Sequence, residues 1–327
     1  MKILLITTKR NINLFTVNYS DINPSDILQV TNNYDYILNE YWKENKYDFI
    51  YGLGGGCVAD ISKYLAFKWE CPLTFIPSIL STDAMFTNAT AYREDNTVKY
   101  HFTKSPDETI FDDNILSSVD HKYHASGWCD VLSSLIACYC WKHYNDKQIE
   151  RLQNNKLKFD SVIYDEVLQY LDCITCPNNK QNRRQLFDTL KRSTEIEAIF
   201  DFPIHEESAE HYFIYNLENY WHDHYLHGEG LVLGILLMAT VVDSELTKYA
   251  FKLMQKCGVK GIMPPKEIVL KTLETMPEFV IKNKLNYSMI DTIEYKNANF
   301  NDIIDKVYGL IHELNNLELL SQKTTTS

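Results

Sequence analysis

Residues 51–63 read YGLGGGCVADISK and set three consecutive glycines between an apolar run and a helical pattern. The apolar run Tyr47–Leu53 predicts a buried strand, and Val58–Lys68 predicts the helix that follows it. Because glycine has no side chain, the backbone N–H groups of Gly54, Gly55 and Gly56 can surround a phosphate at the positive end of the helix dipole. The turn therefore predicts a phosphate-binding site.

The residues after the glycines leave a second interpretation open. Asp60 and Lys63 fall in the first turns of the helix, where Lys63 could reach a phosphate or a substrate anion. The sequence matches neither the spaced GxGxxG of dinucleotide folds nor the GxxxxGK[ST] phosphate loop. A tight structural turn, in which Asp60 only favours the helix N-terminus, is the alternative.

Strand and helix patterns alternate on both sides of this turn. We expect strands at Lys2–Thr7 and Ile12–Val17, then a helix at Ser25–Trp42 whose apolar residues recur every three or four positions. Pro72–Pro77 predicts another buried strand, and Ala89–Phe102 predicts a hairpin. This alternation indicates an α/β domain with a parallel sheet.

The pattern changes after about residue 120. Strand-like runs end there and helical periodicity dominates the rest, so we expect an α/β domain at 1–120 and an all-α domain at 121–327. The helices of the second domain are expected at residues 126–144, 186–200, 209–220, 228–258, 265–274 and 301–320.

Composition and charge exclude several classes of protein. With 327 residues, 45% of them hydrophobic, the chain can bury a large core and is not intrinsically disordered. A formal net charge of −12 argues against nucleic acid or an anionic membrane as a partner. The longest apolar run, Leu231–Val242, is too short to span a bilayer. Most of the eight cysteines sit in apolar stretches, which favours reduced thiols and a cytoplasmic location.

Three segments of the helical half hold residues that can meet around one divalent cation: Gly127–Asp130, Glu210–His211 and Leu226–Glu229. Two imidazoles and one carboxylate would leave coordination positions open for a substrate oxygen, as a Lewis-acid site requires. Ten histidines also offer accidental pairs, and His222 and His224 form a rival cluster beside the third segment. The spacing alone leaves the ligand set open.

Two further groups are interpreted as structural. We expect His205 at the surface. We expect Cys173 and Cys176 to pack in the core, because no second cysteine pair accompanies them as a zinc site would require.

The glycine turn and the stretch after it together resemble a known family. GLGGGCVADISKYLA at 52–66 and PLTFIPSILSTDA at 72–84 are similar to the GGGsxxDxxK and PTxxSTDA signatures of the metal-dependent polyol dehydrogenase superfamily. This superfamily includes glycerol dehydrogenase, iron-containing alcohol dehydrogenases, sn-glycerol-1-phosphate dehydrogenase and dehydroquinate synthase. The resemblance implies a dehydroquinate synthase-like fold, with a shortened Rossmann-like α/β domain and an all-α C-terminal domain.

The resemblance implies roles for residues of the α/β domain. The glycines would hold the pyrophosphate of NAD or NADP, Ser81 and Thr82 would border the nicotinamide, and Asp83 would contact the substrate as the catalytic residue. Tyr92 matches a tyrosine that often edges the nicotinamide pocket. The cofactor-binding residues implied in this way are Gly54, Gly55, Gly56, Asp60, Lys63, Ser81, Thr82 and Tyr92.

Three motifs of the helical half extend the resemblance to roughly residues 47–245. GWCDVLSSLIA, SAEHYFIYNLENYW and LHGEGLVLGILL resemble the family's metal-binding segments and imply Asp130, His211 and His227 as ligands. Zinc is the expected ion, and iron or nickel is compatible with this set. Dehydroquinate synthases use Glu at the position of Asp130, so Asp favours the dehydrogenase branch. The motifs together look closest to sn-glycerol-1-phosphate dehydrogenase.

The N-terminal segment departs from the family pattern. Family members usually place a strand, a helix, a second strand and a second helix before the glycine turn. Here the expected strands Lys2–Thr7 and Ile12–Val17 are joined by only Thr8–Asn11. We therefore expect a whole helix to be missing from the part that usually holds the adenosine half of NAD(P).

The resemblance implies hydride transfer between NAD(P)(H) and a small ketone or its alcohol, with a phosphorylated ketone or polyol as substrate. Lys63, Lys99 and Lys104 are candidates to counter a substrate phosphate. Two alternatives remain: a dehydroquinate synthase-like cyclase or lyase acting on a phosphorylated sugar, and a non-catalytic scaffold that has lost cofactor binding. We expect no nucleic-acid or membrane partner, and the sequence is compatible with a homo-oligomer.

Overall fold

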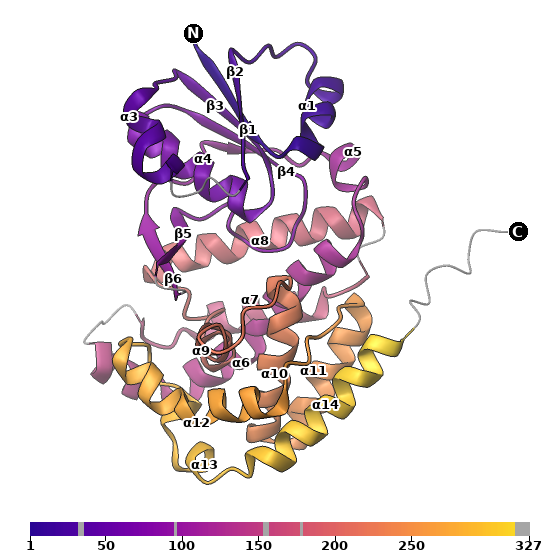
Figure 1. Ribbon diagram of the computed structural model, residues 1–327. Helices are drawn as coiled ribbons and strands as arrows, with labels where there is room; N and C mark the ends of the chain where they lie inside the picture. The colour runs from indigo at the N-terminus through magenta and orange to yellow at the C-terminus, as the bar shows by residue number, and fades with distance from the viewer. Residues whose placement is uncertain (32–35, 95–96, 153–156, 177–178, 318–327) are drawn as a thin grey trace, which may run out of the picture. The chain divides into compact units, whose positions relative to one another are not determined.

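The computed structural model describes residues 1–31, 36–94, 97–152, 157–176 and 179–317, and divides the chain into two compact units (Figure 1). Unit 1 comprises Met1–His124 and Asn179–Lys191, and unit 2 comprises Ala125–Asn178 and Arg192–Ser327. Most of unit 1 is the α/β domain expected at 1–120, and the unit also takes in part of a later helix.

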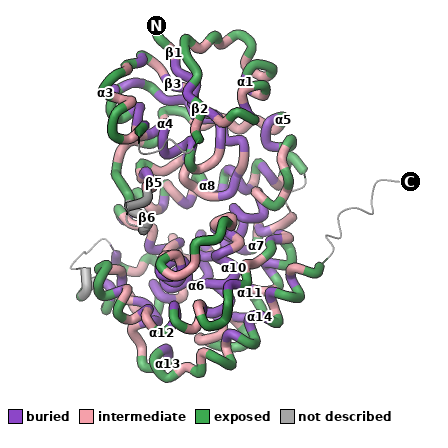
Figure 2. The backbone as a smooth tube through the Cα atoms, viewed as in Figure 1, coloured by how far each residue is buried: buried purple, intermediate pink, exposed green. Residues whose placement is uncertain are grey.

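Unit 1 is built on a parallel sheet with the strand order β2-β1-β3-β4-β7. Both faces of the sheet are covered, so its central strands are apolar and form a buried layer, seen for β1 and β3 in Figure 2. The order reverses direction between β1 and β3, so the carboxyl ends of these two strands lie side by side. The strands are β1 (Ile3–Thr7), β2 (Asp26–Gln29), β3 (Phe49–Gly54), β4 (Leu73–Pro77) and β7 (Glu108–Thr109).

Helices pack on both faces of this sheet. On one face, Phe15 of α1 (Ile12–Asn18) and Ile115 of α5 (Asp113–Leu116) form a cluster with the sheet residues Leu5, Leu53 and Ile76. On the other face lies α4 (Gly56–Trp69), which contacts β1, β3 and β4. The strand and helix that flank the glycines, expected from the sequence, are both confirmed.

The expected hairpin is confirmed as a separate antiparallel pair. Its strands are β5 (Ala89–Glu94) and β6 (Thr97–Phe102). Tyr92 of β5 pairs with Lys99 of β6, and the Lys99 side chain lies outside the described part of the structure.

The expectation for the segment before the glycine turn is wrong, because the structure has a helix where we expected a strand and a strand where we expected a helix. Ile12–Asn18 is the helix α1, and the strand β2 occupies Asp26–Gln29 where a helix was expected. Of the helix expected at Ser25–Trp42, the structure has a later part, a π-helical turn η2 (Ile37–Tyr41) that continues into α3 (Trp42–Glu44). Backbone pairing with β1 accounts for β2, because a tertiary partner overrides weak local periodicity.

The helix that we expected to be missing from this segment is therefore present as α1. The chain runs strand β1, helix α1, strand β2 and a second helical segment before β3, which is the order expected of the family. Its first helix is short rather than absent. The described elements before β3 therefore follow the strand–helix–strand–helix order.

Unit 2 is all-α in the part that the structure describes. The helix α10 lies against α9, α11 and α14 and is buried at Gly228 and from Gly230 to Ala239 (Figure 2). The helices with residues in this unit are α6 (Lys122–Leu152), α7 (Ser161–Asp172), α8 (Lys180–Phe200), α9 (Ala209–Leu217), α10 (His227–Val242), α11 (Ser244–Cys257), α12 (Lys266–Lys282), η4 (Met289–Asp291), α13 (Ile293–Lys296) and α14 (Phe300–Asn316).

Several helices of unit 2 differ from the sequence expectation, among them α12, which runs to Lys282, and α13, which was not expected. The single helix expected at 228–258 is broken at Asp243, whose carboxylate accepts a hydrogen bond from the Leu246 N–H and so begins a new helix. The helix α7 was not expected, and Asp160 caps it in the same way. Over the described residues, no helix has the length and apolar character needed to cross a membrane.

Candidate metal centre and cofactor site

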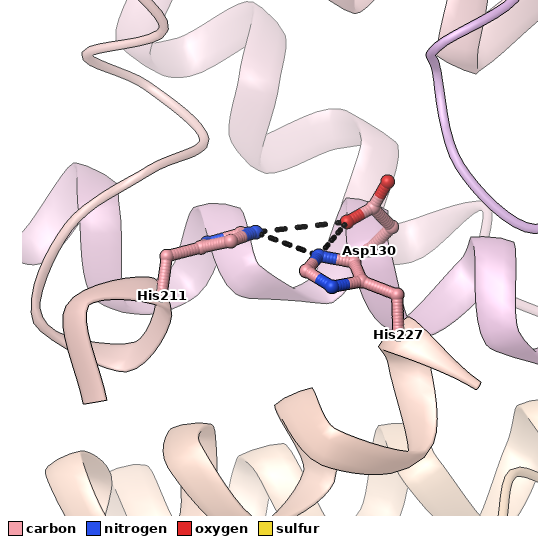
Figure 3. A group of neighbouring side chains, drawn as sticks. All are labelled: Asp130, His211 and His227. Atoms are coloured by element: carbon pink, nitrogen blue, oxygen red, sulfur yellow. Dashed lines mark hydrogen bonds and ion pairs between the residues drawn. The ribbon is translucent and has the colours of Figure 1, made fainter. Parts of the chain in front are cut away.

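Three side chains of unit 2 point toward one another (Figure 3). Asp130 belongs to α6, His211 to α9, and His227 is the first residue of α10. The Nε2 atoms of the two histidines lie 3.1 Å apart. The Asp130 Oδ1 atom lies 3.3 Å from Nε2 of His227 and 3.8 Å from Nε2 of His211. The sequence-predicted ligand set therefore meets at one point.

These distances fit a bound cation. Nitrogen ligands about 2.0–2.1 Å from a tetrahedral zinc ion are about 3.3 Å from one another. Two neutral imidazole nitrogens that face each other direct lone pairs at the same space, and only a proton or a cation between them relieves that repulsion. Asp130 and His211 are buried, while the His227 side chain is 30% exposed, so the group is open on the His227 side. The donor set and its opening fit a divalent metal with a free coordination position.

A buried carboxylate orients one of these histidines. Oε1 of Glu210 lies 2.9 Å from Nδ1 of His211 and also accepts from the Ser208 N–H. With its proton held at Nδ1, His211 directs the Nε2 lone pair at the shared point. The sequence analysis did not assign Glu210 a role, although it is part of the AEH triplet of the motif.

The charges of the group stabilise one another in the metal-free protein. Burial favours the neutral form of Asp130, but hydrogen bonds and positive charge from His211 and His227 outweigh it and lower the pKa of Asp130 to about 2. Burial likewise opposes protonation of His211, and hydrogen bonds to Asp130 and Glu210 overcome it and raise the pKa of that imidazole well above its usual value. A divalent cation would take the place of the proton.

Glycines allow the three helices to come close enough. A Cβ atom at Gly228 would lie 2.3 Å from the backbone oxygen of Ser126 in α6. One at Gly234 would lie 2.6 Å from the backbone oxygen of Glu210 in α9. Both close contacts are next to ligand-bearing turns, so α10 can approach α6 and α9 only with glycine at these positions.

Side-chain bonds set the ends of the ligand-bearing segments. Glu229 accepts from the Leu226 N–H, which fixes the start of α10 at His227. The hydroxyl of Ser133 donates to the backbone oxygens of Asp130 and Glu206, and so joins the Asp130 turn to the segment that leads into α9. The Glu229 cap is local, whereas the bond from Ser133 to Glu206 depends on tertiary packing, which the sequence analysis did not resolve.

The other histidines lie outside this group. His222 and His224, the rival cluster, are exposed. The expected surface position of His205 is wrong, because the residue is fully buried and its Nε2 lies 2.8 Å from the Ser193 hydroxyl. His205 lies in the turn before α9, next to Ile204, which belongs to the core cluster between α6, α7 and α8. Burial lowers the pKa of His205 to about 3.

The glycine turn of unit 1 lies where β3 ends and α4 begins. It is next to the carboxyl end of β1, at the point where the strand order reverses, and such points bind ligands in open α/β sheets. A Cβ atom at Gly54 would lie 2.4 Å from the Val58 side chain, so packing requires glycine there. At Gly56 the nearest atom would be the Ala84 Cβ at 3.9 Å, so packing does not explain this glycine.

The start of α4 fits an anion. The cap residue Gly55 offers no side chain to the first N–H groups of the helix. Cys57, in the first turn of α4, is exposed. A helix N-terminus without a capping side chain, with room at Gly56, suits a pyrophosphate.

The residues expected to act beside the glycine turn differ in their burial and in their contacts. Ser81 is buried, whereas Thr82 and Asp83 are partly exposed in the segment after β4. Asp60 and Lys63 are buried in α4 and paired with each other at 3.3 Å. Tyr92 stacks on His101 with ring centroids 4.3 Å apart. Lys104 is bonded to the Cys71 carbonyl and to Asp107.

A histidine that the sequence analysis did not single out supports the same segment. Nδ1 of His124 accepts from the Leu80 N–H at 3.2 Å, and Nε2 lies 3.0 Å from the Leu116 carbonyl. With both ring nitrogens bonded and the ring buried, desolvation lowers the pKa of His124 to about 4. The neutral imidazole holds the residue before Ser81 in place.

The geometry of both sites can be compared with known proteins. A family model described as iron-containing alcohol dehydrogenase matches residues 16–118. A glycerol-1-phosphate dehydrogenase [NAD(P)+] of Methanococcus maripaludis is 25% identical over 283 residues, covering 84% of this chain and 79% of the relative. A protein of the same name from Thermococcus sibiricus is 24% identical over 61% of this chain and 57% of the relative.

Solved structures agree on the fold. Glycerol dehydrogenase from Schizosaccharomyces pombe matches with a TM-score of 0.65 at 16% identity, covering 96% of this chain and 84% of that one. Over residues 16–118 this chain is similar to the iron-containing alcohol dehydrogenase family. The iron-containing alcohol dehydrogenase from Corynebacterium glutamicum, with a TM-score of 0.63 at 12% identity, covers 94% of this chain and 88% of its own. The superfamily resemblance and the fold expected from the motifs are confirmed.

Proposed function

We propose that the chain is a metal- and NAD(P)(H)-dependent oxidoreductase that interconverts a small ketone and its alcohol. The observation that carries this proposal is the meeting of Asp130, His211 and His227 at one point, with imidazole and carboxylate atoms within 4.8 Å of one another. The open glycine turn supports a nicotinamide cofactor, and the named activity of the curated relatives supports the reaction class.

The roles of the residues are part of the proposal. Asp130, His211 and His227 would hold the cation, which when bound supplies Lewis-acid polarisation of a substrate oxygen. The backbone at Gly54–Gly56 would hold the cofactor pyrophosphate, Ser81, Thr82 and Tyr92 would border the nicotinamide, and Asp83 would orient a substrate hydroxyl. Glu210 would keep the His211 tautomer that leaves Nε2 free for the cation.

The finer assignments also stay proposals. A phosphorylated ketone such as dihydroxyacetone phosphate is the proposed substrate, because curated relatives of this chain are named glycerol-1-phosphate dehydrogenase [NAD(P)+]. Zinc is the proposed ion, although the matching family is named for iron. A cytoplasmic location and a homo-oligomeric state remain predictions from the sequence.

Binding of the cofactor is the first test. Zinc-loaded protein is titrated with NADH and NADPH while energy transfer from tryptophan to bound nicotinamide is followed. We expect saturation at micromolar cofactor, and then turnover with a panel of phosphorylated and unphosphorylated ketones. An absence of binding up to millimolar cofactor would reject the proposal and bring forward the cyclase or the non-catalytic scaffold.

A further inference from the structure

We propose that Lys63 is a positioning residue whose buried ammonium fixes the segment carrying Asp83, rather than a ligand of phosphate. The role of Asp83 in this inference rests on the proposed function, whereas the contacts of Lys63 do not. The inference concerns unit 1 alone.

The ammonium of Lys63 is surrounded by acceptors from the chain itself. Its side chain is fully buried, and Nζ donates to the backbone oxygens of Ala84, at 2.8 Å, and of Ala89. The Thr87 hydroxyl lies 3.5 Å from Nζ. All three partners lie in the segment from Ala84 to Ala89, which follows Asp83 in the chain. An ammonium has three protons, so these acceptors and Asp60 occupy all of its donors and leave none for a phosphate.

Asp60 makes the burial of this charge tolerable. Its carboxylate lies 3.3 Å from Nζ, on the preceding turn of α4, and also accepts a backbone hydrogen bond from Ala91 at the start of the hairpin. A buried ammonium without a carboxylate partner would be strongly destabilising. The pair therefore ties one helix to both the Asp83 segment and β5.

Neutral groups make further contacts with this segment. His124 holds Leu80 at its start, Thr109 donates to the Met85 backbone oxygen at 3.2 Å, and Phe86 packs edge-on against Phe187 at 5.0 Å. Lys63 adds a buried charge to these contacts and bonds the backbone at Ala84 and Ala89, on either side of Met85 and Phe86. Because α4 also begins in the glycine turn, the same rigid helix would hold the cofactor pyrophosphate at one end and set the position of Asp83.

The test replaces the ammonium with an apolar group of similar length. In the zinc-loaded full-length chain, Lys63→Met should speed amide hydrogen exchange across residues 82–91 by at least about tenfold and lower kcat/KM by about 100-fold. NADH affinity and zinc content should stay within about threefold of the wild-type values. Lys43→Met is the matched control, because Lys43 has the same i,i+3 pairing with Glu40 at 3.2 Å but is exposed.

Three outcomes decide between the interpretations. If Lys63→Met lowers NADH affinity by more than about tenfold and leaves exchange in residues 82–91 unchanged, Lys63 contacts phosphate and the inference is wrong. If Lys63→Met does not fold, the double variant Lys63→Met with Asp60→Leu removes both charges and is put through the same measurements. If the wild-type protein neither binds NADH nor turns over any ketone, the proposed function fails, and the exchange comparison still tests Lys63 separately.

Discussion

The glycine turn of unit 1 and the metal centre of unit 2 are built in opposite ways. In the turn, the groups that would bind phosphate belong to the backbone of consecutive residues, Gly54–Gly56, and depend on one strand and one helix. In the metal centre, each of the three side chains comes from a different helix, and their meeting depends on packing at Gly228 and Gly234. A site made of backbone is encoded locally, whereas a site made of side chains from distant segments depends on the packing of the whole unit.

The largest effect should come from removing one metal ligand. His227→Ala takes away one of three converging atoms, so metal affinity should fall by at least about 100-fold and turnover should be lost. Binding of NADH at unit 1 should change less than about threefold, because the two sites are built from separate residues. Metal content after dialysis and the nicotinamide titration measure the two effects.

His224→Ala is the control for this variant, because His224 is an exposed neighbour in the same motif. It should keep the metal and the activity. A His227→Ala variant that stays active without metal would overturn the site assignment.

Acid should weaken both units through one buried histidine in each. Burial is the main cause that lowers the pKa of His124 to about 4 and of His205 to about 3. From pH 6.5 down to these values the unfolded chain binds protons that the folded chain does not. The free energy of unfolding should therefore fall with falling pH, by up to about 1.4 kcal/mol per pH unit for each histidine.

Urea unfolding of the chelator-treated protein at pH 7, 6 and 5 measures this dependence. His205→Gln removes one of the two groups, so its unfolding free energy should depend less steeply on pH than that of the wild-type protein. If the unfolding free energy of both proteins depends on pH equally steeply, His205 is not held neutral in the folded state.

Two helical glycines of unit 2 should respond to alanine with opposite signs. A methyl group at Gly234 would lie 2.6 Å from the Glu210 backbone oxygen, so Gly234→Ala should lower the free energy of unfolding by about 1–3 kcal/mol and weaken metal binding. Gly309 of α14 has no atom within 4 Å of such a methyl group. Gly309→Ala should instead stabilise the protein by about 0.5–1 kcal/mol. Thermal unfolding with and without zinc measures the stability of both variants. An unchanged stability of Gly234→Ala would show that the backbone at Glu210 moves away from the added methyl group at little cost.

The smallest change in stability should come from Gly56. The structure leaves room for a methyl group there, so Gly56→Ala should change the free energy of unfolding by less than about 0.5 kcal/mol. A methyl group on the face that receives the pyrophosphate should nevertheless weaken NADH binding by about tenfold. Unchanged NADH affinity would place the cofactor away from this residue.

The sequence predicted the fold, and which three side chains come together in unit 2, better than it predicted the elements before the glycine turn. The glycine turn and the strand and helix on either side of it are found where expected. Glycines and apolar runs specify the backbone of their own segment, so they can be interpreted without knowledge of tertiary contacts. The meeting of Asp130, His211 and His227 was predicted only through a resemblance, since nothing in their spacing specifies contact. Their roles as ligands await the metal measurements.

The errors have a common physical origin. The segment Ile12–Val17 is rich in β-branched residues but forms a helix, while Asp26–Gln29 becomes a strand because β1 offers it a backbone partner. His205 was placed at the surface because its polarity was visible and the core cluster beside it was not. The support given by Glu210 is likewise a tertiary contact. Local patterns do not contain such partners.

The exposed thiol at the glycine turn offers a direct optical reporter. Cys57 is exposed in the first turn of α4, whereas Cys71, Cys129, Cys138, Cys140 and Cys257 are buried and have raised pKa values that suppress their reaction with maleimides. A maleimide dye should therefore attach to the native chain at Cys57, beside the proposed pyrophosphate position, with the partly exposed Cys173 and Cys176 as the competing sites. Its fluorescence would follow cofactor arrival in real time without any engineered cysteine.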